Sequence, residues 1–129
     1  MHEHELTDED IAITITALEN TCYIIDDFLR SGQKDGKRQA MNNRELATET
    51  IESLKTRSEK VSIQSVEIAI TSLRVLKDQI NELYNLPDST EAVKSKSKEM
   101  RRSVNHAIRT YKAICINAGI DPEAFESYM

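Results

Sequence analysis

The sequence predicts an all-α fold, an antiparallel up-down-up-down four-helix bundle that ends in a short C-terminal helical turn. Within residues 11–29, 66–83 and 93–118, apolar side chains recur at steps of three and four. Such steps keep side chains on one face of an α-helix. Three glycines and two prolines among 129 residues are too few for the frequent turns of an all-β fold. Short connections make neighbouring helices antiparallel, so we expect a single helical-bundle domain over residues 1–129.

The first helix is expected over residues 8–30. Thr7 is a preferred type of N-cap residue, and Asp10, three positions later, can complete a capping box. Gly32 can adopt the left-handed conformation that often follows a helix. These signals bound the first helix at both ends.

The second and third helices are expected over residues 37–58 and 63–85. The second has the fewest apolar positions, and its apolar row does not continue in phase into the third. A row that shifts by about 100° indicates a new helix. Ser62 can cap this new helix, and Pro87 follows its end.

The fourth helix is expected over residues 89–118, with Asp88 as its N-cap and Gly119 as its left-handed end. A short helical turn is expected over residues 122–128, because Pro122 suits the first position of such a turn.

Charge is distributed unevenly along the chain, whose net charge is −5. Residues 1–27 hold eight acidic residues and no lysine or arginine, whereas residues 88–118 hold seven basic and three acidic residues. We expect the acidic first helix to face a basic stripe on the fourth. An acidic chain is a poor general binder of nucleic acid, so a nucleic-acid partner is not expected. The basic stripe comprises Lys94, Lys98, Arg101, Arg109 and Lys112.

The sequence also favours a cytoplasmic protein with no membrane contact. It contains no stretch of about 18 apolar residues that would span a bilayer. Its first residues lack the basic and apolar regions of a secretory signal. Cys22 and Cys115 are expected to be free, buried thiols, as in a reducing compartment.

The first and third helices carry a second apolar row beside the main one. A helix of a four-helix monomer needs a single apolar stripe, so something else must cover the second row. One candidate is the C-terminal tail together with the second helix, and the other is a homodimer or a partner helix. We favour a partner, because the second helix has few apolar residues. The predicted partner-binding residues are Ile13, Ala17, Ile24, Phe28, Ile68 and Val75.

Few residues are arranged for catalysis or metal binding. The sequence has no Glu-x-x-His pair, glycine-rich phosphate loop or Cys-x-x-Cys pair, so neither a metal nor a cofactor is expected. The basic segment from Lys34 to Arg44 can contact phosphate, but a solvated loop is the favoured interpretation.

Residues 101–106 read Arg-Arg-Ser-Val-Asn-His, an Arg-x4-His pattern. It resembles the motif of HEPN domains, small all-α proteins that are often metal-independent ribonucleases, usually acting across a dimer. The resemblance covers six residues. It implies that Arg101 would stabilise phosphate charge and that His106 would transfer protons.

We therefore expect a small non-catalytic protein that acts by protein–protein contact and self-associates, as an immunity protein, antitoxin, inhibitor or adaptor does. The alternative is a HEPN-like ribonuclease that uses Arg101 and His106.

Overall fold

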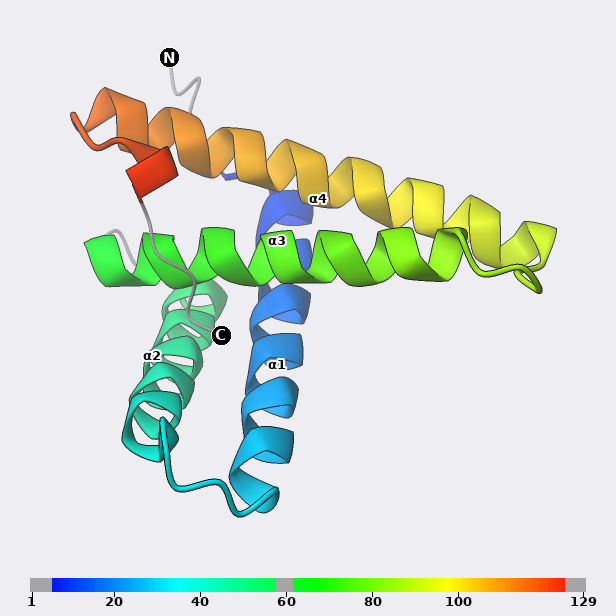
Figure 1. The fold of residues 1–129 in the computed structure, drawn as a ribbon. Helices are drawn as coiled ribbons and strands as arrows, with labels where there is room; N and C mark the ends of the chain where they lie inside the picture. Colours follow the sequence, from blue (N-terminus) through cyan, green and yellow to red (C-terminus); the bar gives the residue numbers. More distant parts are fainter. Residues whose placement is uncertain (1–5, 58–61, 125–129) are drawn as a thin grey trace.

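The computed structural model describes residues 6–57 and 62–124, and these residues form helices and loops without a strand (Figure 1). The prediction of an all-α protein with four long helices is confirmed for this part of the chain. The elements are α1 (Asp8–Arg30), α2 (Lys37–Lys55), α3 (Ile63–Tyr84), α4 (Glu91–Asn117) and the short 3₁₀-helix η1 (Pro122–Ala124).

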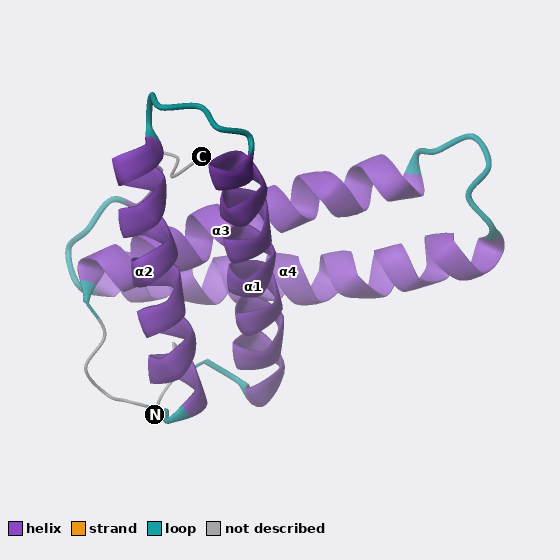
Figure 2. Cartoon of the chain, turned by 90° about the horizontal axis from the view of Figure 1, so that it is seen from below, coloured by secondary structure: helices purple, strands orange, loops and turns teal. Residues whose placement is uncertain are grey.

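The four helices form two antiparallel hairpins that cross. The α1–α2 hairpin lies against the α3–α4 hairpin at a steep angle in both views (Figures 1 and 2). The expected up-down-up-down order along one common axis is not confirmed. The α3–α4 hairpin also extends past α1 toward its loop (Figure 2). We call residues 81–100, which include this loop, the projecting arm.

Small side chains lie where α1 meets α3. Ala17 and Ala69 are buried, and the hydroxyl of Thr21 donates to that of Ser72 across 2.6 Å between two fully buried residues. Small residues let two helices approach closely, and the crossing angle follows from how their side-chain ridges interlock. A steep crossing is therefore compatible with a dense contact at this point.

The weak second helix covers part of the surplus apolar surface. A small buried cluster of Leu18, Ala47 and Ile68 joins α1, α2 and α3. Packing of the second helix was part of the first of the two explanations that the sequence allowed for the second apolar row. It buries Leu18 of α1 and Ile68 of α3, whose cluster contains no residue of α4. A larger cluster joins α1, α3 and α4, and its bulkiest members include Ile70, Leu73, Val104 and Tyr111.

Several helix ends agree with their sequence signals. Thr7 and Asp10 form a reciprocal capping box at the start of α1. The Ser62 hydroxyl accepts from the Ser65 backbone N–H at the start of α3. At the end of α4, Gly119 has a φ of 78°. The Ile120 N–H there donates to the Cys115 carbonyl across 2.8 Å, as in a Schellman motif.

Other boundaries differ from the prediction. The α4 helix begins at Glu91, and Thr90 caps it by accepting from the Val93 N–H. Asp88, the predicted cap, lies in the turn that Pro87 begins.

Two further expected boundaries are only partly covered by the structure. The α2 helix ends at Lys55, short of the predicted residue 58, which lies outside the described residues. Of the expected turn over 122–128, the structure describes η1 alone.

Candidate functional site

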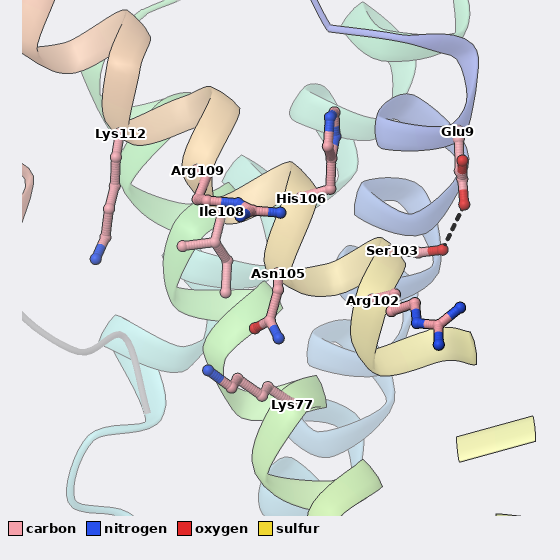
Figure 3. A pocket seen from close by; sticks show the side chains of 9 residues that line it. All are labelled: Glu9, Lys77, Arg102, Ser103, Asn105, His106, Ile108, Arg109 and Lys112. Carbon is pink, nitrogen blue, oxygen red and sulfur yellow. Dashed lines mark hydrogen bonds between the residues drawn. The ribbon is translucent and has the colours of Figure 1, made fainter. Parts of the chain in front are cut away.

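Basic side chains line a pocket beside α4. Positions 102, 105, 109 and 112 recur at steps of three and four, so they share one exposed face of the helix. Lys77 of α3 lies at the edge of this face (Figure 3). The pocket has a volume of about 670 Å³ and opens to solvent. Its lining residues are Glu9, Lys77, Arg102, Ser103, Asn105, His106, Ile108, Arg109 and Lys112. We call Lys77, Arg102, Arg109 and Lys112 the basic face.

Three of the four charges on the basic face are not neutralised within the described part of the chain. Lys112 Nζ lies 2.9 Å from a carboxylate oxygen of Glu123, and this contact lowers the pKa of Glu123. Among the described residues, Lys77, Arg102 and Arg109 have no ion-pair partner. The chain has five more acidic than basic residues, yet three cations at one pocket have no ion-pair partner in its described part.

Three aspartates of α1 pair with basic residues outside α4. Asp8 contacts Arg57, Asp26 contacts Arg44 of α2, and Asp27 contacts Arg30, each across 2.6 Å. The hydrogen bond from Arg44 lowers the pKa of Asp26. We expected the acidic first helix to face the basic stripe of the fourth. For these three aspartates the structure shows other partners.

A buried carboxylate holds His106 at the rim of the pocket. Asp10 is 1% exposed, and its Oδ1 lies 2.6 Å from Nδ1 of His106. Its Oδ2 accepts from the Thr7 backbone N–H and from the Thr110 hydroxyl. An ionised carboxylate only accepts hydrogen bonds, so this arrangement assigns a proton to Nδ1 of His106. The other nitrogen of this half-exposed imidazole, Nε2, does not contact Asp10.

Tyr111 lies close enough to Asp10 to sense its charge. Its hydroxyl is buried and has no hydrogen-bond partner among the described residues. Burial raises the pKa of Tyr111 to about 12, with a smaller opposing effect from Thr14. The Thr14 hydroxyl donates to the Asp10 carbonyl, so its proton does not serve Tyr111.

Among the described residues, Glu9 is the one carboxylate that lines the pocket. Its Oε1 accepts a hydrogen bond from the Ser103 hydroxyl across 2.6 Å (Figure 3). The contact holds Glu9 against one side of α4, where Figure 3 shows it apart from Lys77 and Asn105.

Arg101 and His106, which the sequence singled out together, lie in different surroundings. Arg101 donates to Asn81 across 3.2 Å and lies 5.3 Å from the centre of the Tyr84 ring. His106 contacts Asp10 of α1. Five residues along a helix correspond to about 140° of rotation, which explains why the structure does not bring the two side chains together within one chain.

The six predicted partner-binding residues differ in exposure. Ala17 and Ile68 are completely buried within the chain. The Phe28 ring packs beside Gly36 of the α1–α2 loop. The partly buried members are Ile13, Ile24, Phe28 and Val75. The more exposed large apolar residues of the projecting arm are Leu83, Leu86 and Val93.

Other kinds of site find little support in the described residues. No group of three potential metal-ligating side chains occurs among them. No helix within the described ranges has the length and apolar character to cross a membrane. Cys22 and Cys115 are free thiols, and burial raises the pKa of both.

The sequence singled out His106, and two residues of its predicted basic stripe, Arg109 and Lys112, line the pocket. It did not indicate the role of Asp10 or Lys77. Asp10 gave a clear signal only as a capping residue, and its second contact joins residues 96 positions apart. The shared face of Arg102, Asn105 and Arg109 was readable from their spacing.

Comparison with protein-family models, curated proteins and solved structures finds no match to this chain.

Proposed function

We propose that this chain is a small, non-catalytic helical protein that binds an acidic surface of a protein partner through the basic face. A cytoplasmic immunity protein, antitoxin, inhibitor or adaptor would act in this way. One observation carries the proposal: Lys77, Arg102 and Arg109 have no ion-pair partner among the described residues and lie beside one pocket of an acidic chain.

Physical reasoning connects this observation to a partner. Like charges on one face repel each other, and an approaching anionic surface would relieve that repulsion. Asp8, Asp26 and Asp27 of α1 already have basic partners, so they do not neutralise the basic face. Because the basic side chains come from α3 and α4, they stand on rigid elements, which reduces the entropy lost on binding.

The proposal is tested by photo-crosslinking followed by reconstitution. A photoreactive amino acid replaces Asn105 in the pocket or, as a control, Lys96 on another face of α4, and the full chain is expressed in its native cells. A protein that crosslinks from position 105 and not from position 96 is then purified. Its affinity is expected to fall at least about tenfold for the double variant Arg102→Gln, Arg109→Gln.

The matched control is Arg38→Gln, which removes an exposed arginine of α2 distant in sequence from the pocket. Its affinity should stay within about twofold of the unmodified protein, since a remote exposed charge contributes little. Equal crosslinking from positions 105 and 96, or equal affinities for all variants, would contradict the proposal.

A ribonuclease-like function is a second candidate, because one observation favours it. A buried carboxylate, Asp10, orients His106 at a pocket that also holds unpaired cations. Such a histidine can transfer protons. Arg102 and Arg109, rather than Arg101, would then bind phosphate, since Arg101 contacts Asn81 and Tyr84.

His106→Ala separates the two candidates. If the chain cleaves RNA, this variant should lose at least about 100-fold in rate, whereas partner affinity should change little in a binding protein. RNA that remains intact with the unmodified chain would eliminate the ribonuclease candidate.

Self-association is also part of the proposal. The partly buried Ile13, Ile24 and Val75 would contribute to a dimer, whereas Ala17 and Ile68 already pack inside the chain. Sedimentation velocity at tens of micromolar protein is the appropriate measurement, and a single monomeric species would contradict this part.

A further inference from the structure

We propose that the pocket of the basic face is a binding site for a phosphate monoester, either as a small molecule or as a phosphorylated side chain of the partner. This inference rests on the proposed function, because it names the chemical group of the partner that would enter the pocket.

The donors at the pocket match such a group. Arg102 and Arg109 each present a planar guanidinium, which can bind two oxygens of one phosphate at once. Lys77 adds a third cation from α3, and the Asn105 amide points toward Lys77 in Figure 3. The three charges have no carboxylate partner in the described part of the chain, so a ligand would not have to break an existing ion pair.

A phosphate monoester suits this charge better than a carboxylate does. It carries a charge of about −1.5 to −2 at neutral pH and three acceptor oxygens. A single carboxylate has one negative charge and two oxygens, and it would leave part of the cationic charge unbalanced.

A nucleic acid is the less favoured source of phosphate. Proteins that bind single strands combine cations with aromatic side chains that stack on the bases, and among the described residues no phenylalanine, tyrosine or tryptophan lines this pocket. The chain as a whole carries a net charge of −5, which repels a long polyanion more than a single phosphate group.

His106 adds a positioned ring to the same pocket. Asp10 fixes its Nδ1 side through a contact of 2.6 Å. The other ring nitrogen, Nε2, therefore stays available to a ligand next to the cations of the basic face.

The test is a titration of the full chain, followed by amide NMR shifts and calorimetry, with four defined probes. These are inorganic phosphate, a short alanine peptide with a central phosphoserine, the same peptide with serine, and a six-nucleotide single-stranded RNA. We expect the phosphoserine peptide or inorganic phosphate to shift the amides of residues 102–112. The serine peptide should not shift them.

Variants locate the site. Arg109→Gln is expected to weaken phosphate binding by roughly 10- to 100-fold, as for the loss of charge-assisted hydrogen bonds. Lys96→Gln, on another face of the same helix, should stay within about twofold. Tighter binding of the phosphopeptide than of inorganic phosphate would identify a phosphorylated partner, and equal binding would identify a small phosphate ester.

Three results would overturn the inference: no shift with either phosphate probe, an affinity unaffected by Arg109→Gln, or tighter binding of the RNA than of the phosphopeptide. If phosphate fails but a crosslinked acidic partner still depends on Arg102 and Arg109, this inference is wrong and the proposed function stands. If phosphate binds but no partner depends on these arginines, the proposed function fails alone.

Discussion

Nδ1 of His106 lies 2.6 Å from Oδ1 of Asp10, so a hydrogen bond joins the middle of α4 to the first turn of α1. Asp10 also accepts from the Thr7 backbone N–H as part of a capping box. One buried carboxylate therefore caps the start of α1, connects the two hairpins and orients a histidine at the candidate site.

The first prediction concerns Asp10. In Asp10→Ala, the capping box is lost and the ring of His106 loses its contact with a buried carboxylate. We expect the free energy of unfolding to fall by about 2–4 kcal/mol, measured by urea denaturation at neutral pH. Asp8→Ala is the matched control, because Asp8 lies in the same helical turn with a side chain that is 87% exposed. A loss of equal size in both variants would show that Asp10 has no special structural role.

The second prediction concerns Tyr111 and alkaline pH. Its pKa of about 12 in the folded chain exceeds the value near 10 of an unfolded tyrosine. Between these values the unfolded chain releases the proton while the folded chain keeps it. Stability due to this group is therefore present below pH 10 and is lost as the pH rises toward 12, by up to about 2–3 kcal/mol.

Tyr111→Phe removes this titration. Because the buried hydroxyl has no hydrogen-bond partner among the described residues, the variant should be at least as stable as the unmodified chain at neutral pH. Its advantage should grow between pH 9 and pH 11 in urea unfolding. An identical pH dependence of the two proteins would contradict the assigned burial of the phenol.

The third prediction tests the crossing of α1 over α3. Ala17 is completely buried, and Thr21 and Ser72 bond to each other at the same contact. Ala17→Leu would insert three extra carbons between the helices and should lower the free energy of unfolding by roughly 1–3 kcal/mol. Ala12→Leu, at an exposed position of α1, should leave stability nearly unchanged. Tolerance of leucine at both positions would argue against a close crossing.

The sequence predicted the local structure well, because local signals are sufficient for it. Thr7 with Asp10, Ser62, and Gly119 with Ile120 mark helix ends through contacts within a few residues. Apolar periodicity located the long helices for the same reason.

The arrangement of the hairpins depends on contacts distant in sequence. Thr21 with Ser72 and Asp10 with His106 join residues 51 and 96 positions apart. Both pairs consist of polar residues, which an apolar pattern does not connect. The charge argument placed the acids of α1 against α4, whereas Asp26 pairs with Arg44 of α2. Two basic segments were available to one acidic helix, and net charge alone did not distinguish them.

The candidate site was predictable in part. His106 was singled out through its spacing from Arg101, but a spacing of five places two residues on different sides of a helix. Spacings of three and four, which group Arg102, Asn105 and Arg109, predict a shared face. Lys77 joins them from another helix, and only the packing of α3 against α4 shows that.

The last prediction concerns the projecting arm. Residues 96–100 of α4 lie in the arm, whereas residues 104–108 of the same helix include Val104 and Ala107, which are completely buried in the larger cluster. Both segments lie away from the helix ends, so end fraying affects them little. Amides open more readily where fewer apolar contacts hold the helix. In hydrogen exchange followed by mass spectrometry, 96–100 should exchange at least about tenfold faster than 104–108. Equal protection would indicate that another surface covers the arm in solution, as in a self-associated form.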